Sequence, residues 1–405
     1  ESPWDDLSYE NANSNEPLSM WMYKNEYEDV ALNLLNITPD PLIVQVRGEP
    51  EDLEHVDVRE AIAVPRQDGT WIVDALPELN SAQTISLSPG ETRQLWFVCN
   101  SNGVDAGIHE RKLDLLVLSH ENTTLPIVLR TEVVDIDLDD TPPFMLCNWS
   151  SLGRLESAGF SGEVLQESIE YGMNVLYVSM PSGECNENGE LVGEPNWSRT
   201  DRELSLLTPD CFLFVSVHVR TPKEVEKGSP VWKKAYRAWA QEVTQHLEAK
   251  GFPRSHWAIY PVDEPGLYDG PRIEQFMNVV TDVREAAAEV PIYANPAGAI
   301  TKENFTPLLP YVDVWCPELG TLLRRPWMQE FFLDDEGAQV WCYEAPGWSK
   351  HLRALGFYRS QPLIAFSIGL TGAGYWVHFY SDLWRSDTGE EYGANYGSAG
   401  IWVES

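Results

Sequence analysis

Two adjacent acids, Asp263 and Glu264, stand near the end of the stretch HWAIYPVDEPG at residues 256–266. Each neighbouring carboxylate raises the cost of ionising the other, so the pair favours one charged and one protonated group. These two states together are what general acid–base catalysis with a charged partner requires. A buried strand that ends in a solvated turn is the simpler structural explanation of the same residues. The elements around the acids favour the catalytic interpretation.

Aromatic and polar side chains also stand at the ends of the other predicted strands. Rings can stack on the C–H faces of a sugar, while amides and carboxylates hydrogen-bond to its hydroxyls, so the set suits a neutral carbohydrate. Any one aromatic is more commonly part of a core, and a strand-end histidine is as often packed support as a ligand. The candidate substrate-binding residues are Trp149, His218, Asn295, Trp315, Glu318, Tyr343 and Trp376, of which Trp149 and Trp376 are the two aromatics we favour.

Neither a metal nor a cofactor is expected. No cluster of three His or Cys has metal-ligand spacing, and no Gly-rich loop follows a strand to hold a phosphate. The six cysteines form no CxxC pair, and four lie inside apolar runs. We therefore expect them to be buried and unpaired, as small hydrophobic residues.

The formal net charge is −35, from 63 acidic and 28 basic residues. Nucleic acids and anionic membranes both require a basic surface, so neither is an expected partner. No apolar run approaches the ~18 residues of a membrane span. The polar N-terminus has no signal-peptide core, so we expect a secreted or periplasmic protein whose signal has been removed. Its acidic, lysine-poor composition suits a salt-rich environment.

The first third of the chain has the pattern of an all-β domain. Short apolar runs between residues 18 and 138 are separated by turn signals such as Pro89-Gly90 and Asn102-Gly103, with no helical period. This pattern predicts an antiparallel β-sandwich at residues 1–138. An acidic, proline-bearing hinge, DLDDTPPF at 137–144, follows it.

Residues 139–405 alternate between apolar strands and amphipathic helices, which predicts a (β/α)8 TIM-type barrel. In the helix predicted over 231–251, five apolar residues fall on one face, and a second helix is predicted over 271–290. Little helical pattern follows the eighth strand, so the last helix is expected to be missing. The predicted strands are 144–149, 174–179, 211–219, 256–262, 291–296, 312–318, 339–345 and 374–380.

Active sites of such barrels lie at the C-terminal ends of the strands, which is where this arrangement puts Asp263 and Glu264. The long segment at 181–204 leaves the second strand at the same end. Its Asn188-Gly189 dipeptide is a strong hairpin signal, and loops of this length are usually functional. We expect it to form a lid or wall of the site.

Four stretches, WAIYPVDEP, NWSRTD, VDVWCPE and VWCYEAPG, resemble glycoside hydrolase family 123. That family consists of β-N-acetylgalactosaminidases with a β-sandwich before a (β/α)8 barrel. The resemblance implies a retaining, substrate-assisted exo-hydrolase acting on glycans with terminal β-linked N-acetylgalactosamine. In it, Asp263 would stabilise the 2-acetamido group and Glu264 would be the general acid/base. Tyr343 and Trp376 would hold and enclose the acetamido group.

Two other interpretations stay open. In a double-displacement glycosidase, Glu264 would be the acid/base and Glu344 the nucleophile, with carboxyl groups about 5 Å apart. Such enzymes commonly have Asn before the acid, whereas this chain has Asp263, which favours substrate assistance. A non-catalytic carbohydrate-binding protein on the same fold is the other alternative, against which the intact acid pair argues.

Overall fold

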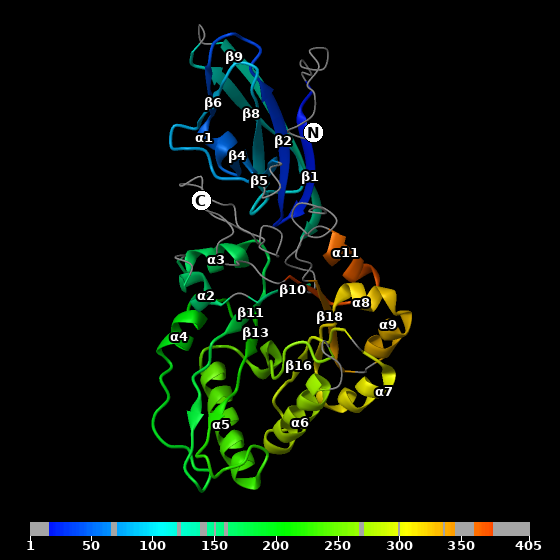
Figure 1. Ribbon diagram of the computed structural model, residues 1–405. Helices are drawn as coiled ribbons and strands as arrows, with labels where there is room; N and C mark the ends of the chain where they lie inside the picture. The colour runs from blue at the N-terminus through cyan, green and yellow to red at the C-terminus, as the bar shows by residue number, and fades with distance from the viewer. Residues whose placement is uncertain are drawn as a thin grey trace. The chain divides into compact units, whose positions relative to one another are not determined.

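The computed structural model describes residues 16–65, 71–119, 123–137, 144–149, 151–157, 161–266, 271–298, 300–334, 337–344 and 360–375. The chain divides into two compact units, with residues 16–137 in the first and residues 144–375 in the second (Figure 1).

The first unit contains two β-sheets that share one core. The buried residues of β8 (Gly107–Val117) alternate with exposed ones, and its Leu113 and Leu115 share a core with Leu95 and Phe97 of the other sheet. This alternation is expected when one face of each sheet is covered. A short helix, α1 (Pro50–Leu53), follows β3. One sheet has the order β1 (Leu18–Lys24), β9 (Thr123–Asp137), β8 (Gly107–Val117), β3 (Leu42–Gly48) and β6 (Thr84–Leu87), and the other β2 (Tyr27–Leu35), β7 (Thr92–Asn100), β4 (Val56–Pro65) and β5 (Trp71–Ala75).

The prediction of a purely antiparallel first domain was wrong for one strand pair. β1 runs parallel to β9, from Leu18 beside Leu129 to Tyr23 beside Val134. Parallel neighbours need a long connection, and these two strands are separated by the rest of the unit. The alternating pattern of β1 shows only that one of its faces is covered, and such a strand can pair in either direction.

The second unit is a nearly closed barrel of eight parallel strands, as the apolar runs predicted. Every neighbouring pair in the sheet is parallel, and one bridge between Ile259 and Ile292 joins the two end strands. The last strand begins two residues earlier than predicted, and the predicted residues 376–380 lie outside the described chain. The order is β15 (Trp257–Ile259), β13 (Phe212–Val215), β11 (Val175–Val178), β10 (Met145–Asn148), β19 (Gly372–Tyr375), β18 (Gln339–Glu344), β17 (Val314–Trp315) and β16 (Tyr293–Ala294).

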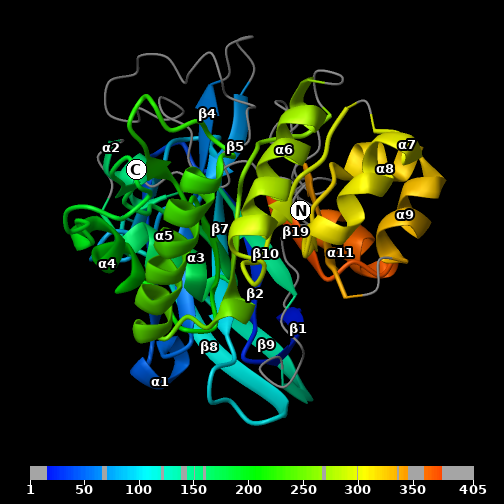
Figure 2. The same cartoon turned by 90° about the horizontal axis from the view of Figure 1, so that it is seen from below.

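Each connection between successive barrel strands contains at least one helix. The longest, α5, starts at Pro230 after Ser229, whose hydroxyl accepts a hydrogen bond from the Trp232 amide at 3.2 Å. This is an N-cap followed by proline at the first helical position. α5 and α6 lie side by side (Figure 2). The helices are α2 (Leu152–Ser157), α3 (Glu163–Glu170), α4 (Ser198–Leu204), α5 (Pro230–Ala249), η2 (Arg254–His256), α6 (Pro271–Ala286), α7 (Lys302–Phe305), η3 (Thr306–Tyr311), α8 (Leu319–Arg324), α9 (Pro326–Leu333) and α11 (Ser360–Ser367).

Side chains along each barrel strand alternate between the interior and the helix layer. On β18, Trp341 and Tyr343 belong to the interior cluster, while Val340 and Cys342 belong to the core beneath the helices. This is the period of two expected for strands. Consecutive residues at a strand end therefore face opposite sides of the barrel wall.

All six cysteines are buried and unpaired, as predicted. Cys147 and Cys316 lie in the barrel interior, and Cys342 lies beneath the helices. Burial raises the pKa of the Cys147 thiol, because an apolar environment disfavours the thiolate. The thiols therefore act as packing groups in this structure.

Leu247→Ala should destabilise the barrel unit by about 2–5 kcal/mol, because the α5 side chain is fully buried and its loss leaves a cavity. Gln245→Ala, on the exposed side of the same helix, should change stability by about 0.5 kcal/mol or less. The measurement is urea unfolding followed by far-ultraviolet circular dichroism, whose helical signal comes mainly from this unit. Equal midpoints for the two variants would contradict the burial of this face.

Candidate active site

Asp263 lies just beyond β15 and is held by two neighbouring side chains. The Tyr260 hydroxyl donates to Asp263 Oδ1, and the Asn295 amide donates to the same oxygen at 3.1 Å. Asn295 Nδ2 also lies 2.8 Å from the Tyr260 hydroxyl oxygen. Asp263 Oδ2 receives no hydrogen bond within the described part of the chain. One oxygen is thus fixed by the protein, while the other can accept a hydrogen bond from a ligand.

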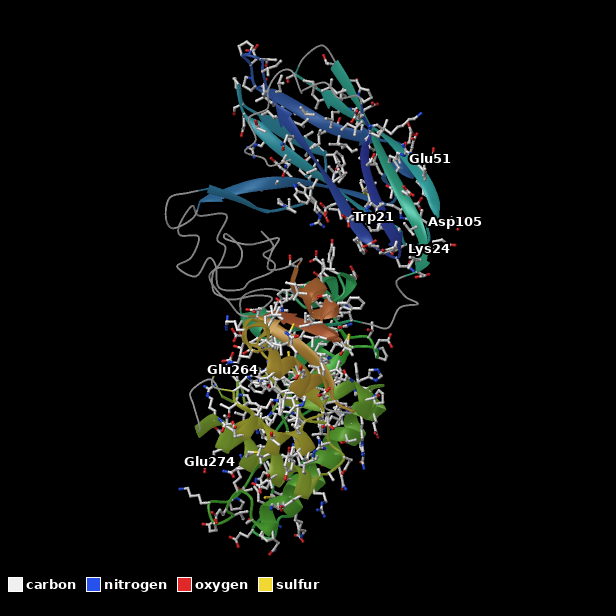
Figure 3. The ribbon with its side chains drawn as sticks, turned by 90° about the vertical axis from the view of Figure 1, so that its right-hand side faces the viewer. Trp21, Lys24, Glu51, Asp105, Glu264 and Glu274 are labelled. Atoms are coloured by element: carbon white, nitrogen blue, oxygen red, sulfur yellow. The ribbon has the colours of Figure 1, made fainter. Side chains whose placement is uncertain are left out.

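Glu264 has an unusual backbone conformation, with φ at +44°. A non-glycine residue in the left-handed region is uncommon and needs support from its surroundings. Asn295 Oδ1 provides it by accepting a hydrogen bond from the Glu264 amide at 3.1 Å. Because of this backbone conformation at Glu264, the side chains of Asp263 and Glu264 are oriented differently from two adjacent residues of an extended strand. Figure 3 labels Glu264 in the second unit.

Asn295 supports both acids at once. It follows β16 and is 3% exposed, and its amide group contacts Tyr260, Asp263 and the Glu264 backbone. Both polar atoms of its side chain are therefore used within the protein. The sequence placed Asn295 among the substrate contacts, whereas these bonds make it a residue that positions the acids.

The surroundings of Glu264 raise the pKa of its carboxyl. Burial is the largest cause, and the negative charges of Asp263 and Glu318 act in the same direction. A hydrogen bond from the Tyr343 hydroxyl to Glu264 Oε1 and the positive charge of Arg272 oppose the shift but do not cancel it. A half-buried carboxyl with a raised pKa retains its proton to higher pH, which suits a general acid.

Aromatic side chains surround the acids on the interior side of the barrel. Trp149, at the end of β10, lies edge-on to Tyr343 with ring centroids 5.6 Å apart and is stacked with Phe214 at 6.2 Å. Tyr343 belongs to the interior cluster, and its hydroxyl reaches Glu264. Trp149, Asn295 and Tyr343 come from three different strand ends, yet they gather with the acids because parallel strands finish at the same edge.

A second pair of acids, Glu318 and Glu344, lies beside α8. Glu344 Oε1 accepts a hydrogen bond from the Gly320 amide at 2.5 Å, and Glu318 accepts one from the Thr321 hydroxyl. Arg324 lies 3.9 Å from the Glu318 carboxylate. Burial and the charge of Glu318 raise the pKa of the Glu344 carboxyl. Glu344 follows Tyr343 on β18, so strand alternation places it on the helix side of the wall.

Two other candidates lie away from the acids, and one lies outside the described residues. Trp315 is fully buried beneath the helices, with its ring 4.9 Å from that of Phe332, and so belongs to the core. It sits one residue after Val314, which faces the interior, and this alternation turns the indole outward. His218 lines a cavity against α5 and α6. The structure does not describe Trp376.

Sequence reasoning missed Tyr260 and Arg272. Tyr260 stands three residues before Asp263 in the same stretch, but an aromatic in an apolar run gives no signal of its own. Arg272, at the start of α6, donates to the Asp263 backbone oxygen at 2.9 Å. Its position next to Pro271 at a helix start gave no indication of this contact, because Arg272 is nine positions from Asp263 in the sequence.

The predicted hairpin at Asn188-Gly189 is present. Gly189 has φ at +71°, and Cys185 and Leu191 form an antiparallel bridge on either side of the turn. Lys234 of α5 donates to the Asn188 backbone oxygen at 3.0 Å, so the tip of the hairpin lies against α5. That the 181–204 segment forms a lid or wall of the active site stays a prediction. At its base, β12 (Gly183–Glu184) pairs with β14 (Val219–Arg220).

Among the described residues, no group of three or more His, Cys, Asp or Glu could hold a metal ion. None of the described helices is both long and apolar enough to cross a membrane.

No protein-family model and no curated protein sequence matches this chain. Among solved structures, it is similar to a family 123 glycoside hydrolase from Clostridium perfringens, described for glycolipid glycan hydrolysis, with a TM-score of 0.66 and 11% identity over 95% of this chain and 77% of that one. A family 39 glycoside hydrolase from Bacteroides cellulosilyticus has a TM-score of 0.40 and 9% identity, over 95% of this chain and 79% of that one. A ruminal family 26 endo-β-1,4-mannanase has a TM-score of 0.38 and 10% identity, over 93% of this chain and 89% of that one. The first likeness shows that the chain has a glycoside-hydrolase fold.

Glu264→Gln should stabilise the folded protein at neutral pH. Because the folded-state pKa is raised, the unfolded carboxyl ionises first as pH increases, and folding loses stability until the folded carboxyl ionises too. Glutamine does not ionise and so removes this loss of stability. The stability gained by the variant should therefore be present at neutral pH and vanish by about pH 4. Thermal unfolding across this range measures it.

The control is Glu274→Gln, which changes an exposed acid on α6 and should leave stability nearly unchanged. A gain for Glu264→Gln that persists undiminished at the acid end would show that the raised pKa is not its cause.

Proposed function

We propose that this protein is a retaining exo-β-N-acetylgalactosaminidase that uses the 2-acetamido group of its substrate as the nucleophile. The observation that carries the proposal is the asymmetric support of the two acids. Asp263 is bound through one oxygen by Tyr260 and Asn295, while Glu264 has a raised pKa and is bound by Tyr343. The fold likeness to a family 123 glycoside hydrolase supports the class of reaction.

In the first step, the acetamido oxygen attacks C1 of the sugar and the bond from C1 to the leaving oxygen breaks. Glu264 gives its proton to that oxygen, so the aglycone departs as a neutral alcohol. The developing oxazolinium ion carries positive charge on the former amide. Asp263 Oδ2, which accepts no hydrogen bond in the described residues, is available for the acetamido N–H. Its negative charge then offsets the charge formed in the transition state.

In the second step, water attacks C1 from the face that the aglycone left. Glu264, now a carboxylate, takes a proton from this water, and the C1–oxygen bond of the oxazolinium breaks to restore the acetamido group. Two inversions give net retention at C1. Tyr343 donates to Glu264 in the structure, and this bond would stabilise the carboxylate between the two steps. This assignment differs from the expected role of Tyr343 as an acetamido contact.

The double-displacement alternative requires Glu344 to reach C1 from inside the barrel. Glu344 instead accepts a hydrogen bond from the Gly320 amide of α8 and follows Tyr343 on the strand, which faces the interior. This bond, which holds the Glu344 carboxylate against α8, argues for the acetamido oxygen as nucleophile. The non-catalytic alternative gives no reason for a left-handed Glu264 or for the bonds that hold it.

The purified protein should hydrolyse p-nitrophenyl β-N-acetylgalactosaminide and leave the matching β-galactoside almost untouched. The reason is that the galactoside lacks the group that attacks C1. Initial rates of p-nitrophenolate release at equal substrate concentration measure the difference. Similar rates on both substrates would favour a protein nucleophile, whereas no release from a panel of aryl glycosides would favour a binding protein.

Asp263→Asn should lower kcat by about 100- to 1000-fold with a smaller change in KM, because the charge it offsets develops mainly in the transition state. Glu344→Gln is the matched control, and we expect it to keep kcat within about tenfold of wild type. Steady-state kinetics on the aryl N-acetylgalactosaminide separate the two. If Asp263→Asn stays near wild type, Asp263 only replaces the neutral Asn of the rival mechanism, and a sugar adduct trapped on Glu344 would establish that rival.

A further inference from the structure

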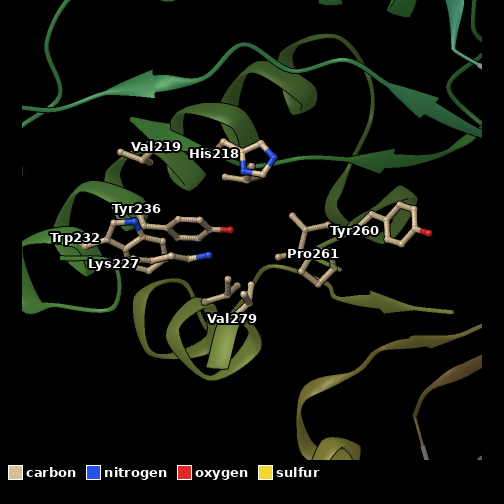
Figure 4. A pocket seen from close by; sticks show the side chains of 11 residues that line it. His218, Val219, Lys227, Trp232, Tyr236, Tyr260, Pro261 and Val279 are labelled. Atoms are coloured by element: carbon tan, nitrogen blue, oxygen red, sulfur yellow. The ribbon is translucent and has the colours of Figure 1, made fainter. Parts of the chain in front are cut away.

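A small cavity lies between the outer face of the barrel wall and the helix pair α5 and α6 (Figure 4). It has a volume of about 150 Å³. A cavity of about this size in another protein holds a benzene molecule. The space therefore suits a compact ligand of few atoms rather than a glycan chain.

The cavity is separate from the candidate active site. Ile259, which lines it, belongs to the core beneath the helices, whereas the Tyr260 ring packs with the interior cluster. In Figure 4, the Tyr260 hydroxyl points away from the cavity, and that hydroxyl donates to Asp263. The strand end at Ile259 and Tyr260 thus stands between the cavity and the acids.

A tyrosine hydroxyl of α5 points into this cavity. Tyr236 of α5 is 3% exposed, and its hydroxyl faces the open space (Figure 4). The structure shows no hydrogen bond for this hydroxyl among the residues it describes. The hydroxyl oxygen is accessible from the cavity, so a ligand in this space can form a hydrogen bond with it. Burial raises the pKa of Tyr236, so the group remains a hydroxyl that can donate.

Lys227 is an exposed residue whose ammonium group points toward the cavity, at its solvent-facing side (Figure 4). Within the described chain it makes no ion pair, although the protein carries a net charge of −35. The nearby Asp282 carboxylate, which borders Gly228, is paired with Lys233 at 3.3 Å. Burial and the charge of Lys227 lower the pKa of His218, so that imidazole is neutral at neutral pH. The cavity therefore offers one positive charge and a hydroxyl donor.

The rest of the lining is mainly apolar and includes Trp232, Val279 and Val283, together with the strand end Ile259–Pro261. A ligand that satisfies both surfaces has an anionic head and a short hydrocarbon body. We propose that this cavity is a binding site for a small monocarboxylate, whose carboxylate bonds to Lys227 and Tyr236 and whose hydrocarbon part packs on Trp232 and the two valines. The proposal does not rest on the glycosidase reaction: neither acid lines the cavity, and Tyr260, which forms part of its wall, turns its hydroxyl away from it toward Asp263.

Titration of the full-length protein with butyrate, followed by isothermal calorimetry or ligand-observed NMR, tests the proposal. Butyrate should bind saturably at one site, and the isosteric neutral butyramide should bind about tenfold more weakly or not at all, because it lacks the charge that Lys227 recognises. Lys227→Met and Tyr236→Phe should each weaken butyrate binding, with the larger loss, about tenfold or more, for the lysine.

Lys223→Met is the matched control, since it removes an exposed lysine of the same loop that does not line the cavity. It should bind butyrate as the wild type does. The proposal is overturned by the absence of saturable butyrate binding, by equal binding of butyramide, or by a Lys227→Met variant that binds like wild type. Each readout is binding itself, so glycosidase activity does not enter the result.

Discussion

The alternation of side chains across the barrel wall is the constraint on which the rest of the second unit depends. Adjacent residues of a strand face opposite sides, so Tyr343 packs in the interior and reaches Glu264, while Glu344 bonds to the Gly320 amide of α8. The same rule puts Tyr260 with the interior cluster and Ile259 in the wall of the α5–α6 cavity. A one-residue shift in any of these strands would exchange the two sets of side chains.

The acids are held in a costly arrangement that the surrounding bonds stabilise. Glu264 occupies the left-handed region and lies half-buried beside another acid, both of which are unfavourable for an isolated residue. Asn295 offsets this by bonding to the Glu264 amide and to Asp263. Strain and a raised pKa in the same residue are typical of a site selected for reactivity rather than stability.

Most of the fold of the second unit could be predicted because its signals are local. Near-continuous apolar runs identified all eight strands, and the 3.6-residue period of α5 identified its buried face from Trp232 to Leu247. The direction of β1 beside β9 could not be predicted, because it depends on partners more than 100 residues apart in sequence. The roles of Tyr260 and Arg272 could not be predicted either, because their contacts with Asp263 depend on a turn that the local sequence pattern does not define.

The sequence by itself determined the chemical types present and the strand end that carries them: an Asp-Glu pair after an apolar run, with aromatic and amide residues after other runs. Only the tertiary structure decided which of these residues meet. It brought Asn295 and Tyr343 to the acids and turned Trp315 into the core, and it placed His218 at a different cavity. The physical reason is that strand register and the backbone conformation at Glu264 set the direction of each side chain, and both are fixed by contacts distant in sequence.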